Sequence, residues 1–198
     1  SITGARMMHN YFQIGGIRED LPADFHQRIR SLTKQLKQGI EECDQLLSDN
    51  ELFLARTKGI GIINSIDAID YGVSGPSLRA SGVAEDIRAT EPYGLYEKMD
   101  FGIPVGTEGD CWDRYYVRVQ EMRESVKIVE QALNMMPMGD HMANVRRLIR
   151  PPVGESFVRT ESPRGDLSVF VVSDGTDKPY RVKVRPPSFC NLMVIKDL

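Results

Sequence analysis

The hydrophobic periodicity of this chain changes once, near residue 139, and that change constrains the fold more than any other feature. Before it, apolar residues recur every three or four positions, which is the period of amphipathic helices. After it, apolar and polar residues alternate, which is the period of strands. The pattern predicts an α+β fold, with a mainly helical part in residues 1–139 and a small antiparallel sheet in residues 155–187. We expect the two parts to form one partial domain, 1–198.

Three helices and a long loop are predicted before residue 110. Apolar spacing favours helices at residues 23–47, 51–57 and 65–71, and a buried turn or short strand at residues 59–63. Residues 72–109 are rich in Gly, Pro, Ser and Asp, which is typical of a loop. Long loops within compact domains tend to be functional or to lie at interfaces.

A helix of about 25 residues is predicted after Asp110, whose side chain suits an N-cap. Its apolar positions are three and four residues apart, the spacing of helix–helix packing in a bundle. We therefore expect this helix to be the central packing element, with Met122 facing the core and Arg123 on the opposite face. The predicted core stripe consists of Trp112, Tyr115, Val119, Met122, Val126, Val129 and Leu133.

Three strands are predicted in the second part of the chain. Residues 156–161, 167–172 and 180–184 have the strand period, and turn-forming residues separate them at 162–166 and 173–179. These strands are expected to form the small antiparallel sheet.

Size and charge bound the class of protein. A compact chain of 22.3 kDa exposes roughly 9,400 Å², against roughly 32,000 Å² when unfolded, so a sizeable core is expected. The net charge of −3 gives no global basic surface, which argues against nucleic acid as a partner. The longest apolar runs are far shorter than the roughly 20 residues that span a bilayer. We expect a soluble intracellular chain.

The residues that most often carry chemistry are few and scattered. Cys43, Cys111 and Cys190 form no C-x-x-C pair of the kind that holds zinc or an iron–sulfur cluster. His26 and His141 are expected to be ordinary surface residues. The sequence therefore predicts no metal site.

His9 differs because the segment 6–12 combines a cation, an imidazole and aromatic rings before two glycines. An imidazole titrates near physiological pH, so it can act as a proton carrier. Gly59 and Gly61 lack the third glycine of a dinucleotide fingerprint. No complete active site emerges, which points to a component of a larger assembly.

Four segments, in this order, resemble the large catalytic-core subunit of respiratory complex I, the 49-kDa subunit. They are residues 4–16 with 20–22 (GARMMHNYFQIGG and DLP), 74–83 with 86–88 (SGPSLRASGV and DIR), 109–115 with 121–125 (GDCWDRY and EMRES), and 172–176 with 179–185 (VSDGT and PYRVKVR). Together they cover most of the chain.

The resemblance implies a subunit of a proton-translocating NADH:quinone oxidoreductase, or of an enzyme with a related electron donor. Such a subunit lies in the peripheral arm and packs against a small subunit that carries a four-iron–four-sulfur cluster. The two subunits enclose the cavity in which quinone is reduced. Further expected partners are other peripheral-arm subunits and, through the assembly, the membrane arm. The expected location is peripheral, at the cytoplasmic face of the bacterial inner membrane or the equivalent organelle compartment.

Quinone, the cluster and bound NAD belong to that assembly, so this chain alone is expected to bind no cofactor. Many family members have a histidine directly after the Gly-x-Arg-Met stretch, close to the cluster. Met8 stands at that position here, and His9 follows. The resemblance therefore places Arg6, Met8 and His9 near the cluster or the quinone. Because methionine takes no proton, redox-linked protonation there would require His9.

A second group of residues is predicted to lie at subunit interfaces. Arg79 precedes small residues and Gly82, which let a backbone approach another chain closely. Arg88, Arg181 and Arg185 lie in loop-like or strand segments of the matching motifs.

The 49-kDa family is similar to the large subunit of nickel–iron hydrogenases, so the expected fold is hydrogenase-large-subunit-like. This leaves two alternatives open. One is a membrane-bound energy-converting hydrogenase, which also has a short link like that between Met138 and Glu155. The other is a structural module, whose loop 72–109 and strand hairpin dock onto neighbouring subunits. Because the chain begins at Ser1 and the family's subunit is longer, we expect a fragment that is inactive in isolation.

Overall fold

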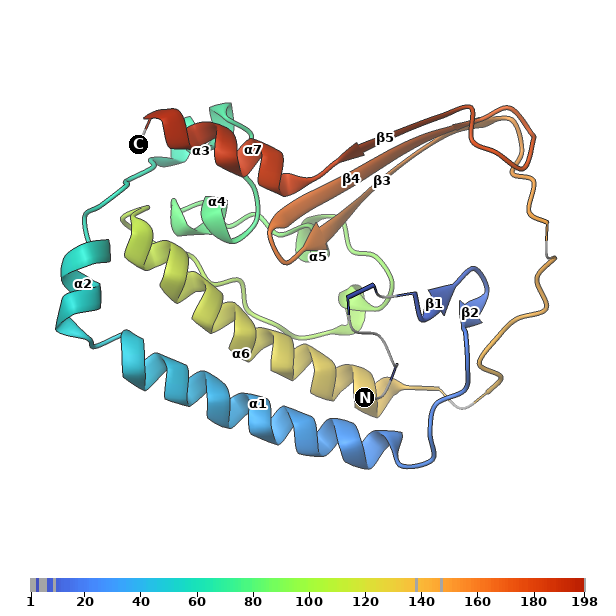
Figure 1. The fold of residues 1–198 in the computed structure, drawn as a ribbon, viewed down its shortest axis with the longest axis horizontal. Coiled ribbons are helices and arrows are strands. Elements are labelled where there is room, and N and C mark those ends of the chain that lie inside the picture. Colours follow the sequence, from blue (N-terminus) through green and yellow to red (C-terminus); the bar gives the residue numbers. More distant parts are fainter. Residues whose placement is uncertain (1–2, 4–6, 9, 138, 147, 198) are drawn as a thin grey trace.

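Two long helices lie side by side along one side of the molecule, and a three-stranded sheet extends from shorter helices on the other side (Figure 1). This is a computed structural model, and it describes residues 3, 7–8, 10–137, 139–146 and 148–197. The mixture of helices and antiparallel strands confirms the α+β class. In chain order the elements are β1 (Phe12–Gln13), β2 (Gly16–Ile17), α1 (Phe25–Leu47), α2 (Glu51–Thr57), α3 (Ser65–Asp70), α4 (Pro76–Ala80), α5 (Ile87–Thr90), η1 (Tyr96–Lys98), α6 (Cys111–Met135), β3 (Gly154–Ser162), β4 (Gly165–Ser173), β5 (Arg181–Arg185), α7 (Pro187–Met193) and η2 (Val194–Asp197).

The helices α1, α2, α3 and α6 agree with the predicted ones to within two residues at either end. Side-chain caps fix several of their starts. The Asn50 and Asn64 side chains accept hydrogen bonds from backbone amides in the first turns of α2 and α3, and Asp110 accepts one from Asp113 N at 2.8 Å in α6. Each cap satisfies an amide that has no partner within its helix.

The segment 72–109 is not the continuous loop that its composition predicted. It contains the short helices α4 and α5 and the 3-10 turn η1. Such short elements show no apolar period in a sequence, and neighbouring segments determine whether they form. Residues 59–63 form turns and no strand.

The sheet has the order β3–β4–β5, with antiparallel pairing throughout. Each predicted strand is present, and β3 and β4 extend beyond the predicted ends. Val158, Val169 and Val184 are cross-strand neighbours, so they lie on one face of the sheet. The prediction missed the two-residue pair β1–β2 and the C-terminal helix α7.

The core face of α6 is narrower than the predicted stripe. Val119, Val126 and Leu133 are buried, whereas Met122 and Val129 are each 42% exposed. Arg123, expected on the solvent side, bonds Glu41 of α1. The predicted orientation of residues 122 and 123 was therefore wrong. The physical reason is that α6 packs between α1 and α4, so two narrow faces are buried rather than one wide stripe.

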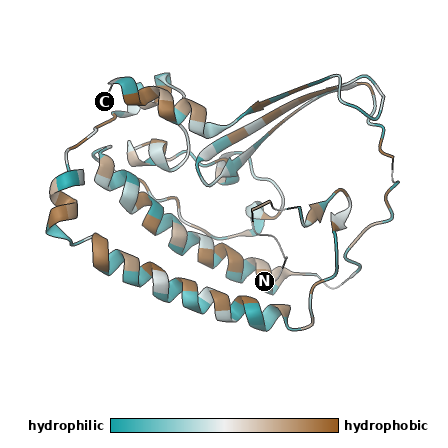
Figure 2. Ribbon diagram, viewed as in Figure 1, coloured by the Kyte–Doolittle hydropathy of each residue, from teal (hydrophilic) through white to brown (hydrophobic). Residues whose placement is uncertain are grey.

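Burial is limited across the whole chain. The buried hydrophobic residues form two small clusters, one of which joins α1 to α6, while the other joins the segment 63–78 to Val194. The exposed area is 13,893 Å², about 4,500 Å² above that of a compact chain of this mass. The expected sizeable core is therefore absent from the described residues. Hydrophobic segments of β5 and α7 contribute to the exposed surface (Figure 2).

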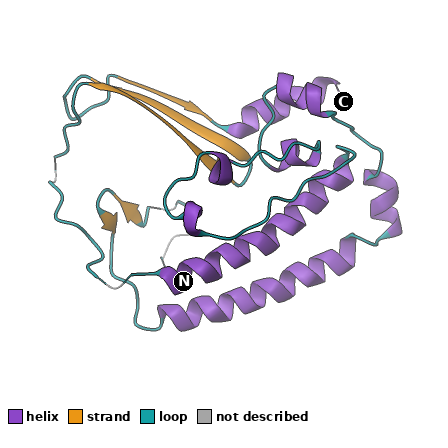
Figure 3. Cartoon of the chain, turned by 180° about the vertical axis from the view of Figure 1, so that it is seen from behind, coloured by secondary structure: helices purple, strands orange, loops and turns teal. Residues whose placement is uncertain are grey.

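The base of the sheet is fixed at a junction of three distant segments. A Cβ atom on Gly75 would overlap the backbone of Gly165, and one on Gly165 would overlap Ser74. Asn191 of α7 accepts a hydrogen bond from Ser74 N at 3.0 Å and donates one to Arg164 O at 2.9 Å. From this junction the sheet reaches away from the helices, with the β4–β5 connection at its far end (Figure 3).

Candidate functional site

The strongest concentration of buried charge surrounds Arg79 of α4, whose side chain is 1% exposed. Its Nε atom donates to Glu121 Oε1 at 2.6 Å, and its Nη2 atom donates to Glu161 Oε1 at 3.0 Å. Its Nη1 atom donates to the Glu85 carbonyl at 2.7 Å and lies 3.7 Å from Asp86 Oδ2. One arginine thus joins α4, the segment before α5, α6 and β3.

A second arginine completes this cluster. Arg88 Nη2 donates to Asp86 Oδ2 at 2.6 Å, and Arg88 Nε donates to Asp86 Oδ1 at 3.0 Å. The Arg88 guanidinium lies over the rings of Phe101 and Tyr96, with 5.1 Å and 5.9 Å to their centroids. We call Arg79, Asp86, Arg88, Glu121 and Glu161 the Arg79 cluster.

Burial acts differently on two carboxyl groups of the Arg79 cluster. Burial raises the pKa of Glu161, and although Arg79 partly offsets this effect, the negative charge of Asp86 adds to it. Burial also acts to raise the pKa of Asp86, but the hydrogen bonds and charge of Arg88, with the charge of Arg79, lower it overall. Glu161 is therefore easier to protonate than an ordinary glutamate.

A cavity of about 390 Å³ opens beside the Arg79 cluster. Arg79, Arg88 and Glu161 contribute to its wall, as do Arg118 and Met122 of α6. Both arginines of the cluster already have carboxylate partners within the chain. The cluster is therefore suited to holding its four segments in place rather than to binding an anionic substrate.

The start of α6 is also fixed by polar contacts. Asp113 Oδ2 accepts hydrogen bonds from the backbone amides of Thr107, Glu108 and Gly109. Arg114 donates to the carbonyls of Gly109 and Gly61, each at 2.7 Å. The motif at 109–115 is thus explained by the turn that it stabilises.

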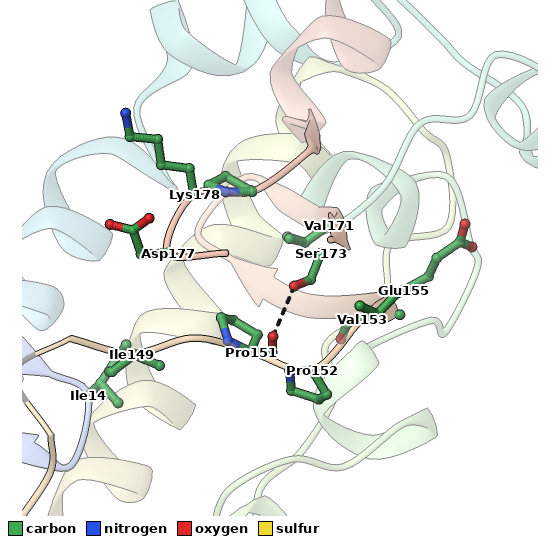
Figure 4. Close-up of a pocket in the computed structure, with 13 residues that line it drawn as sticks. Ile14, Ile149, Pro151, Pro152, Val153, Glu155, Val171, Ser173, Asp177 and Lys178 are labelled. Atoms are coloured by element: carbon green, nitrogen blue, oxygen red, sulfur yellow. Dashed lines mark hydrogen bonds between the residues drawn. The ribbon is translucent and has the colours of Figure 1, made fainter. Parts of the chain in front are cut away.

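A cavity of about 680 Å³ lies between the segment before β3 and the connection after β4 (Figure 4). Ile14, Ile149 and Val171 contribute apolar surface. Ser173 Oγ donates to the carbonyl of Pro151 at 3.3 Å. The volume falls in the range of ligand pockets, and the mostly apolar lining suits an apolar group.

No group of three or more His, Cys, Asp or Glu side chains in the described ranges is placed to hold a metal ion. Within those same ranges, no helix is long and apolar enough to cross a bilayer.

The residues predicted near a cluster or quinone are only partly described. Arg6 and His9 lie outside the described residues. Met8 is described, and it is 81% exposed.

The predicted interface residues divide into two groups. Arg79 lies in the interior of this chain, and Arg88 is paired with Asp86 with its side chain 15% exposed, so their placement at an interface was wrong. Arg185 is held within the chain by Asp166 and by the Gly72 carbonyl. Gly82 and Arg181 are exposed and stay candidates.

Sequence reasoning missed the carboxylates of the Arg79 cluster. Glu121 and Glu161 follow Arg79 by 42 and 82 residues, so no local motif connects them to it. The usable signal was the position of Arg79 within the small and apolar run 76–82, where an unpaired charge is costly.

Comparison with protein families gives one match across the chain. The model described as "Respiratory-chain NADH dehydrogenase, 49 Kd subunit" matches residues 1–152 and 139–198.

Curated bacterial relatives, all named as NADH-quinone oxidoreductase subunits of one kind, agree with this match. The relative from Carboxydothermus hydrogenoformans is 47% identical over 197 residues, covering 100% of this chain and 54% of its own length. The relative from Bacillus cytotoxicus is 46% identical over 198 residues, with the same two shares. A relative from a Roseiflexus species is 44% identical over 204 residues, covering 99% of this chain and 54% of its own length. The chain spans about half the length of the curated relatives it matches.

Proposed function

The chain belongs to the 49-kDa subunit family of respiratory-chain NADH dehydrogenases, and on this premise we propose that it is part of the quinone-reducing core of a proton-translocating NADH:quinone oxidoreductase. The observation that carries the proposal is the family match along the chain, together with relatives named as NADH-quinone oxidoreductase subunits that align with nearly all of it. NADH or a related donor supplies the electrons.

In this proposal the chain positions neighbouring groups and forms no complete active site. It belongs to a single partial domain with a hydrogenase-large-subunit-like fold. It packs against an iron–sulfur subunit and other peripheral-arm subunits at the cytoplasmic face of the membrane, and through them it reaches the membrane arm. The cluster of the neighbouring subunit delivers electrons to quinone. This chain contributes Arg6, Met8 and His9 to the surroundings of the cluster or quinone, and Gly82 and Arg181 to interfaces.

The named relatives do not favour the hydrogenase alternative, because they are quinone oxidoreductase subunits. The docking alternative differs from the main proposal in one respect: the chain would hold subunits together without affecting electron transfer. A substitution near the cluster distinguishes the two.

The test is Arg6→Met in the full-length subunit of the assembled enzyme. A positive charge near a cluster stabilises its reduced form, so removal of Arg6 is expected to lower the reduction potential of the terminal cluster. Redox titration followed by electron paramagnetic resonance measures that potential. NADH-driven quinone reduction and hydrogen-driven dye reduction are assayed on the same preparation.

The matched control is Lys34→Met, which removes the same charge from an exposed position on α1. It is expected to leave the potential unchanged. An equal potential in both variants would reject the placement of Arg6, and hydrogen-driven activity without quinone reduction would reject the proposed enzyme.

A further inference from the structure

The outer edge of β5 has no partner strand. Because the sheet order is β3–β4–β5, β5 pairs with β4 on one side only. Among the described residues, no other strand lies along its second side. The backbone amides and carbonyls on that side can therefore pair with an added strand.

The side chains of β5 divide by charge between the two faces of the sheet. Alternation places Arg181 and Lys183 on one face, and Val182 and Val184 on the other. Val182 is 50% exposed and Val184 is 53% exposed. Val184 is level with Val169 and Val158, so the apolar face continues across all three strands.

The two outer cations of β5 are free to meet a partner. Arg181 and Lys183 are exposed, and neither forms an ion pair with any described residue. Arg185, at the base of the strand, is held by Asp166 and by the Gly72 carbonyl at 3.0 Å. The strand is thus anchored at one end and presents two unpaired positive charges along its exposed length.

We propose that a strand from a partner polypeptide adds to the outer edge of β5, with acidic side chains opposite Arg181 and Lys183 and apolar side chains opposite Val182 and Val184. The partner is defined by charge complementarity: it alternates acidic and apolar residues over about five positions.

The same charges disfavour a second copy of this chain. Antiparallel pairing of two β5 strands about Lys183 would place Lys183 opposite Lys183, and Arg181 opposite Arg185. Like charges directly opposite each other destabilise a strand pair. Cations on an edge strand also prevent self-pairing in water, but this role alone leaves the valine face exposed. An acidic and apolar strand answers both features at once.

The inference concerns a binding surface and is independent of quinone chemistry. Its test is amide hydrogen exchange in the native assembly, purified through an affinity tag on the full-length protein. Strand addition is expected to slow the outward-facing amides of residues 181–185 by at least about 100-fold relative to their intrinsic rates. A solvated edge leaves those amides unprotected, and packing on the valine face alone does the same.

The charge-reversed variant Arg181→Glu with Lys183→Glu is expected to abolish this protection. Both residues are exposed and unpaired, so the fold of the sheet should persist, and the amides bonded to β4 report this directly. The control variant, Lys34→Glu with Arg56→Glu, makes the same charge change on α1 and α2 and should keep the protection.

Three outcomes would overturn the inference: unprotected outward amides in the native assembly, protection that persists after charge reversal, or protection traced to a second copy. The last is detected by co-expressing an untagged copy of the chain and finding it in the purified assembly. Failure of the proposed function appears separately, as absent NADH-driven quinone reduction in the same preparation.

Discussion

Arg79 illustrates how one residue joins four segments of the chain. We expect Arg79→Met to lower the free energy of unfolding by about 3–5 kcal/mol, because three carboxylates would stay near one another without their shared cation. Urea-induced unfolding followed by circular dichroism measures the change.

Arg123→Met is the matched control for Arg79→Met, since Arg123 also contacts two carboxylates but its ion pairs are partly solvated. It should cost no more than about 1 kcal/mol. Equal losses in the two variants would show that burial of the Arg79 cluster adds nothing to its strength.

Glu161 should impart a pH dependence of defined sign. Burial raises its pKa in the folded protein above the ordinary value of 4.5. Its contribution to stability is therefore fully present below about pH 4.5 and is lost as the pH rises through the raised pKa. The free energy of unfolding of the unmodified protein, minus that of Glu161→Gln, is expected to fall over this interval.

Asp86→Asn provides the opposite sign. The pKa of Asp86 is lowered from 3.8, so its contribution is present above pH 3.8 and is lost as the pH falls through the lowered pKa. Urea titrations at a series of pH values measure both differences. A difference for Glu161→Gln that rises with pH would contradict the effect of burial.

At the scale of elements, two valines on α6 test which face of the helix is packed. Val126 is 5% exposed and Val129 is 42% exposed. We expect Val126→Ala to cost about 2 kcal/mol, since it removes buried methyl groups and leaves a space beside α1, while Val129→Ala should cost less than about 1 kcal/mol. Thermal unfolding of both variants gives the comparison, and a reversed order would mean that α6 is rotated from the described position.

The same helix shows what a sequence can and cannot predict. The ends of α1 and α6 were predictable because an apolar period repeated over many turns outweighs local irregularities. The rotation of α6 was not, because Met122 and Val129 satisfy the same period as their buried neighbours. Arg79 and Arg88 were identified as important but assigned to a surface, since their carboxylate partners become neighbours only in the folded chain. Only the tertiary fold distinguishes a buried ion cluster from solvated arginines.

At the scale of the whole molecule, the large exposed area predicts a low sensitivity to denaturant. Unfolding from 13,893 Å² would expose about 18,000 Å², against about 23,000 Å² for a compact chain of the same mass. Because the denaturant m value scales with this difference, we expect an m value about 20% below that of a compact protein of equal length. Urea unfolding of the purified chain measures it, and an m value typical of a compact protein would contradict the described surface.

The junction at Gly75 and Gly165 gives the sheet the mechanics of a lever. Its backbones touch with no side chain between them, so the sheet is clamped at its base, while its other end lies far from the helices. Nine residues at about 3.3 Å each make an arm of about 30 Å, so a tilt of about 5° at the junction moves the far end by about 2.6 Å. Displacements too small to disturb the packing around Asn191 would therefore be amplified at the β4–β5 connection. A partner strand seated along β5 would damp this motion, which couples the docking of a neighbour to the position of the loop 74–75.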